Sequence, residues 1–191
     1  MDRRDYFKKQ LLLSSELDDG FAQAEEADWR LVTDLAIVGV WAGLVVTENG
    51  TPNLTVNVSA GTSYDKNGSR CRVPSTQNVN VAVDSSAVST AVSGGGNSKI
   101  ISVFLKFARA LSDPRTDGDG NLVNFVSDES FSFFVVQSAE APSPTPPALL
   151  ADGILLCDIT RAFGQSTIVN ANISTSRRED AYVIAGSPLT I

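Results

Sequence analysis

Apolar residues recur with a helical period in one stretch of the chain, residues 14–38. Seven positions there are separated by alternating steps of four and three residues, and all but one are apolar: Leu17, Phe21, Ala24, Asp28, Leu31, Leu35 and Val38. This spacing aligns the side chains along one face of an α-helix, and we call these positions the heptad stripe. Ser14 or Ser15 can cap the start of the helix, and Gly39 is typical of its end.

The heptad stripe has two interpretations. It can form a short coiled coil between copies of the chain, in which the polar Asp28 fixes the register and lowers the stability. It can instead be the face with which one helix packs on its own domain. Helical periods of 3.5 and 3.6 residues diverge by only about 20° per heptad. A stripe of this length therefore does not distinguish a coiled coil from a helix that packs on its own domain. Trp29 and Trp41 flank the stripe and are interpreted as packing residues.

Beyond the helix the period changes to two. Residues 54–60 alternate between apolar and polar side chains, as in a strand with one buried face. The Asn67-Gly68 pair between two short extended segments predicts a β-hairpin. Further strand-like segments lie at 79–83, 100–111, 131–136 and 154–159, with a weaker one at 168–173. The pattern predicts a mainly β fold, an antiparallel β-sandwich of about seven or eight strands with an N-terminal α-helix.

The expected organisation is a helical segment at 1–40, a β-sandwich domain at 41–176 and a C-terminal tail at 177–191. We expect the tail to be ordered only where it packs on something. Residues 85–98 consist mainly of Ser, Ala, Val and Gly and predict a flexible surface loop. Residues 140–148 include four prolines and predict an extended segment that carries the chain from one edge of the β structure to another.

Composition excludes several classes of function. The 191 residues include 15 Lys and Arg against 22 Asp and Glu, a net charge of −7, so binding of nucleic acid through phosphate contacts is not expected. No histidine is present, which removes His-dependent triads and His-ligated zinc. The longest apolar run, residues 35–46, is shorter than the roughly 20 residues of a membrane-spanning helix. Cys71 and Cys157 are interpreted as buried, reduced thiols.

Candidate chemistry is sparse. Residues 113–121 resemble part of a calcium loop, but position 9 of an EF-hand loop counted from Asp117 is Phe125. We therefore interpret the Asp117–Asp119 region as a hairpin turn, with a weak cation site as the alternative. No nucleophile elbow, phosphate loop or dinucleotide fingerprint occurs in the sequence. We therefore expect no catalytic residue, no cofactor and no metal ligand. A carboxylate-dependent hydrolase is the weakest of the hypotheses.

Charge is concentrated in the helix. Residues 16–34 contain seven acidic residues and one basic residue, Arg30, so this segment carries −6. Such a helix repels itself and would be stabilised by a basic surface on a partner. The alternative is a solvated acidic face on a helix that packs against its own sheet.

Three segments carry a resemblance to a known class of protein: residues 13–28, 54–70 and 104–115, the last with a Phe-Leu-Lys-Phe strand and an Asp-Pro-Arg turn. In this order they are similar to small structural proteins of tailed bacteriophages, from baseplates and the base of tail fibres. The resemblance covers residues 10–165. It implies a virion component of the tail, made in the cytoplasm of the host bacterium, that assembles in several copies, often trimers. It implies no catalytic residues.

The leading hypothesis is therefore a phage tail protein that joins the baseplate or tail tube to a tail fibre. Its expected partners are copies of itself, as a homotrimer, and other tail or baseplate proteins. The heptad stripe is the expected assembly interface. No nucleic acid or membrane partner is expected. The alternative hypothesis is a carbohydrate-binding β-sandwich for attachment to the host surface, with Tyr64, beside the Asn67-Gly68 turn, as the aromatic candidate for stacking on a sugar.

Overall fold

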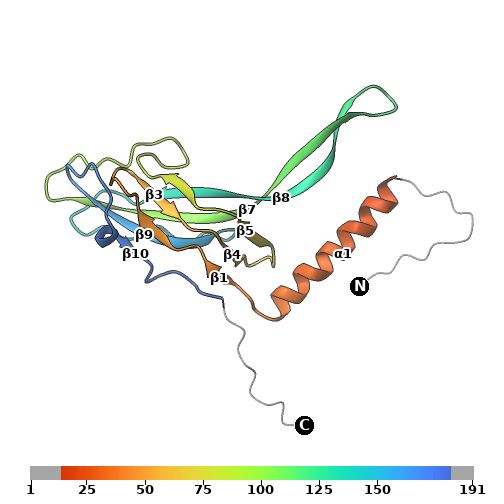
Figure 1. Cartoon of the computed structure of the whole chain (residues 1–191). Coiled ribbons are helices and arrows are strands. Elements are labelled where there is room, and N and C mark those ends of the chain that lie inside the picture. Colours follow the sequence, from red (N-terminus) through yellow and green to blue (C-terminus); the bar gives the residue numbers. More distant parts are fainter. Residues whose placement is uncertain (1–13, 182–191) are drawn as a thin grey trace, which may run out of the picture.

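The computed structural model describes residues 14–181, in which one long helix precedes a mainly β body (Figure 1). Helix α1 spans Ser14–Asp34. Ten strands lie in the described part: β1 (Gly39–Gly43), β2 (Val46–Glu48), β3 (Thr55–Val58), β4 (Gly61–Tyr64), β5 (Arg70–Val73), β6 (Gln77–Asn80), β7 (Ser98–Thr116), β8 (Leu122–Gln137), β9 (Ile154–Ala162) and β10 (Ile173–Ser174). A 3-10 turn, η1 (Asn170–Asn172), precedes β10. The predicted class is confirmed, with ten strands rather than seven or eight.

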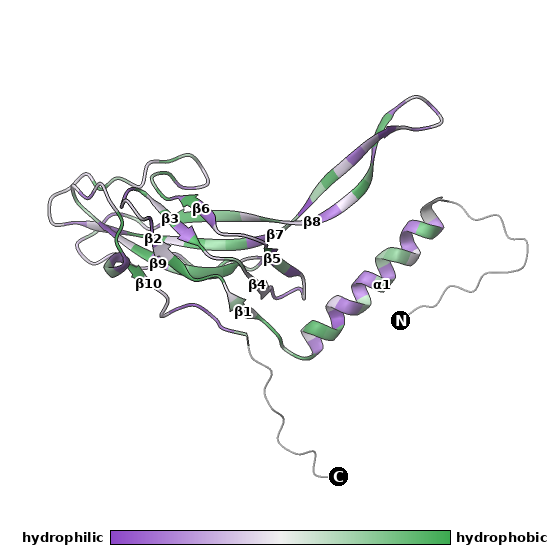
Figure 2. Ribbon diagram, viewed as in Figure 1, coloured by the Kyte–Doolittle hydropathy of each residue, from purple (hydrophilic) through white to green (hydrophobic). Residues whose placement is uncertain are grey.

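The strands form three antiparallel sheets arranged like a sandwich. Their orders are β1-β4-β5, β2-β3-β6 and β10-β9-β7-β8. Apolar side chains from all three sheets fill one core, and the alternation at residues 54–60 places Val56 and Val58 fully inside it. The central strand β7 contributes Ile101 and Val103, which are also fully buried. Figure 2 shows the apolar residues gathered on the strands of this body.

The apolar run at residues 35–46 contains β1, and β2 begins at its last residue, Val46. β1 pairs with β4, whereas β2 pairs with β3 in a different sheet. The chain bends between them at Gly43 and Leu44, whose φ angles are 66° and 53°. Because of this bend, one short stretch of chain, residues 39–48, supplies an edge strand to each of two sheets.

Helix α1 ends at Asp34, before the predicted end at residue 38. The amide of Ile37 donates to the carbonyl of Val32 (3.1 Å), and the amide of Ala36 donates to the carbonyl of Thr33 (2.9 Å). These two bonds are those of a Schellman motif, with Ala36 in the left-handed conformation (φ 52°). The prediction that Gly39 ends the helix is wrong, because alanine takes the position that glycine usually occupies.

Gly39 and Val38 belong to the sandwich. Gly39 begins β1 with a φ of 113°, and a Cβ at this position would collide with the carbonyl oxygen of Glu179. The Glu179 carbonyl accepts a hydrogen bond from the amide of Val40, and the amide of Ala181 donates to the Val40 carbonyl, both at 2.8 Å. The beginning of the predicted tail therefore runs beside β1 of its own chain, while residues 182–191 lie outside the described residues. Val38 packs against the core.

The predictions for the two low-complexity segments, residues 85–98 and 140–148, differ in how well they agree with the structure. The prediction of a flexible loop at residues 85–98 is wrong in its middle, because Thr90 and Val92 are buried. Arg161 on β9 donates a hydrogen bond of 2.6 Å to the hydroxyl of Thr90 and ties this loop to the sheet. The extended segment at 140–148 is confirmed as a crossing, since it connects β8 to β9 and these two strands pair with opposite sides of β7.

Strands β7 and β8 continue beyond the body as a long two-stranded ribbon, which we call the arm and define as residues 108–130 (Figure 1). The sequence predicts shorter strands because the outer part of the arm is rich in Ser, Asp, Pro and Gly. The tip is the predicted hairpin turn. There the Asp117 carboxylate accepts hydrogen bonds from the amides of Asn121 (2.7 Å) and Asp119 (2.9 Å), and these bonds lower the pKa of Asp117.

Candidate assembly surface

The heptad stripe is exposed along the whole of α1. The exposed fractions are 44% for Leu17, 75% for Phe21, 60% for Leu31 and 56% for Leu35. Ala24 and Asp28, the remaining two positions on the helix, are exposed as well. The alternative that the stripe packs on the chain's own domain is therefore wrong. Leu35 directly follows the last helical residue, Asp34, and is exposed, whereas Val38 lies farther on and packs against the core.

A different face of α1 contacts the body. Trp29 meets Phe107 of β7 edge to face, with ring centroids 6.0 Å apart. Arg109 of the arm forms an ion pair with Glu25, and its guanidinium lies 5.9 Å from the Trp29 ring centroid. A Cβ at Gly68 would collide with the carbonyl of Trp29, so the turn between β4 and β5 also touches the helix. With 100° between successive residues, Asp28 lies about 100° from Trp29 and about 60° from Glu25 around the helix, beside the contact face, and it is exposed.

The acidic residues of α1 are only partly neutralised within the chain. Glu25 pairs with Arg109, and Glu26 pairs with Arg30 at 2.6 Å. Asp28 has no hydrogen bond or ion pair within the described residues and is exposed in the middle of the heptad stripe. The helix thus presents a surface that is apolar at its ends and carries an unpaired carboxylate at its centre.

The arm is a second exposed apolar surface. Along β8, alternation places Val123 and Phe125 on one face of the ribbon and Leu122 and Val126 on the other, and all four are exposed. On β7, Leu111 is exposed on the same face as Arg109. A two-stranded ribbon is marginally stable without further packing, so the arm is a surface that a neighbouring molecule can stabilise.

An open cleft lies between β5 and the root of the arm on β8. It has a volume of about 410 Å³ and is lined by six residues: Arg70, Arg72, Pro74, Glu129, Ser130 and Phe131. Arg70 comes within 3.8 Å of Glu129, which is too long for a hydrogen bond. In the described part of the chain, Arg70 and Arg72 are the arginines that donate no hydrogen bond; each of the others donates at least one.

Sequence reasoning missed this cleft. The available signal is the order Arg70-Cys71-Arg72, since alternation in a strand directs both arginines to one face and the cysteine to the other. The structure confirms the alternation, because both arginines are exposed and Cys71 is fully buried. The second wall of the cleft comes from β8, which no local pattern connects with β5.

The other candidate groups occupy ordinary structural positions. Cys71 and Cys157 are buried free thiols, as predicted. Tyr64 is half-buried and meets the exposed Trp41 edge to face, with ring centroids 6.4 Å apart. Within residues 14–181 no group of acidic residues and cysteines is placed to hold a metal ion. None of the described helices has the length and apolar character needed to cross a bilayer.

Comparison with known proteins finds no family model that matches the chain, and no curated protein matches it either. The functional interpretation rests on the exposed surfaces of the fold and on the sequence resemblance of residues 10–165.

Proposed function

We propose that this chain is a structural subunit of a bacteriophage tail that acts through protein–protein contacts and not through catalysis. It assembles with copies of itself as a homotrimer and joins the baseplate or tail tube to a tail fibre. It is made in the host cytoplasm and resides in the virion. The observation that carries the proposal is the exposed heptad stripe on a helix whose other face is already docked on its own body.

The energetics favour an interface larger than the stripe alone. The exposed fractions of Leu17, Phe21, Leu31 and Leu35 range from 44% to 75%, and covering each side chain contributes on the order of 1–2 kcal/mol at about 25 cal/mol per Å². Association itself costs about 4–15 kcal/mol in lost rotational and translational freedom. The exposed apolar residues of the arm supply further area on the same end of the molecule, where both α1 and the arm project from the body (Figure 1).

The test of self-assembly is light scattering coupled to size exclusion on the full chain. We expect a trimer at roughly tens of micromolar, and we expect Leu31→Asp to shift the chain toward monomer because it places a charge in the interface. Val88→Asp is the matched control, since Val88 is similarly exposed (54%) but lies in the 85–98 loop away from α1. A wild-type chain that remains monomeric while folded contradicts the proposal.

The test of location is immunogold labelling of purified phage particles with antibodies against the chain. Labelling confined to the tail end that carries the fibres is the expected result. Labelling of the capsid, or of no particle at all, contradicts the assignment to the tail.

The carbohydrate-binding alternative has one supporting observation, the aromatic pair of Trp41 and Tyr64, in which Trp41 is 47% exposed. Exposed aromatic rings can stack on sugar rings. Binding to a glycan array that is lost in both Tyr64→Ala and Trp41→Ala would favour this function. Binding that survives both substitutions, or no binding at all, argues against it.

A further inference from the structure

We infer that the heptad stripe of one copy docks in the Arg70/Arg72 cleft of the next copy, where Asp28 pairs with the two arginines. The inference rests on the self-assembly proposed above and names the surface that receives the helix. In this contact, the basic surface that stabilises the acidic helix is formed by Arg70 and Arg72 of a neighbouring copy.

The cleft has the chemistry to bind a carboxylate. Arg70 and Arg72 lie two residues apart on β5 and share one exposed face, so their guanidinium groups act together. Neither donates a hydrogen bond within the described residues, and an Arg–carboxylate pair offers two parallel hydrogen bonds. In a chain of net charge −7, two neighbouring arginines that share only one acidic contact, the 3.8 Å approach of Arg70 to Glu129, are a specific feature. These two arginines form a local basic surface to which the acidic helix of another copy can bind.

The polarity of the cleft matches that of the stripe. Pro74 and Phe131 supply apolar wall beside the arginines. The stripe likewise has apolar residues on both sides of one carboxylate, with Leu31 following Asp28 by one helical turn. A helix that lies in the cleft can therefore cover apolar area with its leucines while Asp28 meets the guanidinium groups.

The competing arrangement joins stripe to stripe at the centre of the trimer. In a parallel assembly of that kind, the Asp28 carboxylates of all copies would face one another, and like charges at close range repel. Docking in the cleft replaces this repulsion by attraction to Arg70 and Arg72. One contact between copies would pair Asp28 and Arg72, which have no hydrogen bond or ion pair within the described part of a single copy, and would give Arg70 a closer carboxylate than Glu129 at 3.8 Å.

The place of the cleft is compatible with a closed ring. Phe131 is the cross-strand partner of Phe107, and Phe107 is the residue that Trp29 of the chain's own helix touches. A helix that arrives from a neighbouring copy would therefore lie beside the resident α1. Stripe and cleft are different surfaces of the same chain, so the contact is head to tail and closes when the rotation between copies completes a circle.

The experiment is a charge-reversal cycle on the full chain, with the midpoint concentration of association measured by sedimentation velocity. Arg72→Glu and Asp28→Arg are each expected to raise this midpoint by about tenfold or more, as for loss of one partner of a close charge pair. The double variant with both changes is expected to recover most of the loss, because the pair is restored with reversed signs. Lys99→Glu, an equal change of charge at the end of β7 opposite to the arm, is the control and should leave the midpoint within about twofold.

Asp28→Asn separates the two arrangements. Removing the charge weakens association if Asp28 pairs with the arginines, and it strengthens association if the Asp28 residues face one another. Arg72→Gln serves as a milder second variant, and circular dichroism establishes that each variant is folded. A wild-type chain that associates while Arg72→Glu and Arg72→Gln have no effect, or while the reversed pair fails to recover, overturns the inference but leaves self-assembly intact. A wild-type chain that never associates overturns both.

Discussion

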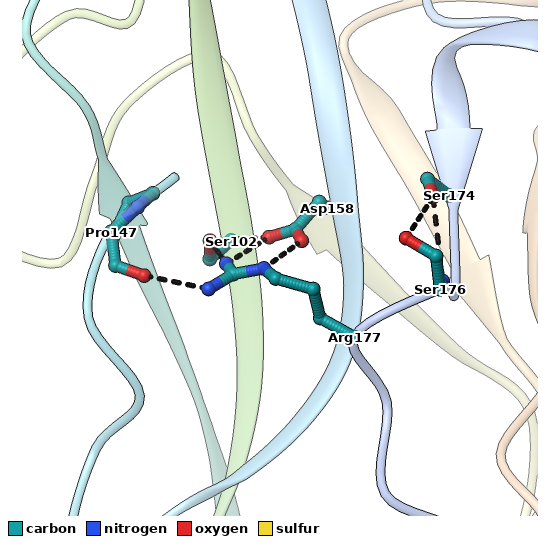
Figure 3. A network of polar contacts seen from close by, with 6 residues as sticks. All are labelled: Ser102, Pro147, Asp158, Ser174, Ser176 and Arg177. Atoms are coloured by element: carbon teal, nitrogen blue, oxygen red, sulfur yellow. Dashed lines mark hydrogen bonds and ion pairs between the residues drawn. The ribbon is translucent and has the colours of Figure 1, made fainter. Parts of the chain in front are cut away.

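Arg177 binds Asp158 through two parallel hydrogen bonds. Its Nε lies 2.7 Å from one carboxylate oxygen and its Nη2 lies 2.8 Å from the other. Ser102 on the neighbouring strand donates to the same carboxylate at 2.6 Å, and Arg177 also donates to the carbonyl of Pro147 at 3.0 Å (Figure 3). This network joins the residues after β10 to β9, to β7 and to the proline-rich segment, so it fixes the segment around Arg177 on the body.

Arg177→Met is therefore expected to lower the free energy of unfolding by about 2–3 kcal/mol, because it leaves the nearly buried Asp158 carboxylate without its charged partner. Urea denaturation followed by circular dichroism measures this. Arg30→Met, the same change in an exposed ion pair of α1, is expected to cost about 0.5 kcal/mol or less. Equal losses for the two variants would contradict the role of the network.

Thr90 holds the low-complexity loop through Arg161. Its hydroxyl is fully buried, donates to the Val81 carbonyl at 2.6 Å and accepts from the Arg161 guanidinium at 2.6 Å. Thr90→Val preserves the shape but leaves a buried cation with one partner fewer, so we expect a loss of about 2 kcal/mol in unfolding free energy. Thr47→Val, at an exposed position of β2, should change the stability by about 0.5 kcal/mol or less. A Thr90→Val variant as stable as the wild type would show that the bond to Arg161 contributes nothing.

The two thiols should react only after unfolding. Burial raises the pKa of Cys71 to about 12 and raises that of Cys157 as well, and both side chains are fully inaccessible. At pH 8, a thiol with that pKa is ionised about once in 10⁴ molecules, and the thiolate is the reactive form. In native buffer, we expect a chromogenic disulfide reagent to react with neither thiol within minutes. In denaturant, we expect it to react with two thiols per chain. Rapid reaction of either thiol in the native protein would contradict their burial.

Glu140 makes one end of the same loop sensitive to acid. The amide of Ser93, the side-chain amide of Asn97 and the amide of Gly94 donate to its carboxylate, and these bonds lower the pKa of Glu140 from 4.5 to about 2. A group whose pKa is lowered by folding contributes stability above its unfolded pKa and loses it as the pH falls through the folded value.

Wild type and Glu140→Gln should therefore differ most above about pH 4.5, with the wild type more stable, and should converge as the pH approaches about 2. Urea denaturation at a series of pH values measures the difference. Glu26→Gln, which changes the same residue type in an exposed helical pair, should show no comparable pH dependence. A constant difference between the Glu140 variant and the wild type across this range would contradict the hydrogen-bonded carboxylate.

The parts of the fold that depend on local pattern could be predicted, and the parts that depend on distant partners could not. Val56 and Val58 alternate with polar residues, and the strand they predict is β3. The burial of Thr90 escaped prediction because its partner, Arg161, is 71 residues away. The end of α1 was placed too late because Ala36 adopts a left-handed conformation that glycine more often takes.

The same division holds for the assembly surface. The periodicity of Leu17 to Leu35 defines the stripe without any structure, and the structure adds that nothing within the described chain covers it. The cleft requires β5 and β8 to meet, and the sequence between Arg72 and Phe131 contains no pattern that connects them. In the sequence, only the placement of Arg70 and Arg72 on either side of a buried cysteine indicates a basic face on β5.

One mechanical property follows from the continuity of β7. The strand runs from the tip of the arm, through one irregularity at Asp113 (φ 54°), into the middle of its sheet, where it is hydrogen-bonded to β8 on one side and to β9 on the other. A pull along the arm would load many backbone hydrogen bonds in parallel rather than open them one after another. The arm is thus continuous with a strand that is hydrogen-bonded on both sides. A displacement of its tip would therefore be transmitted to the core of the body.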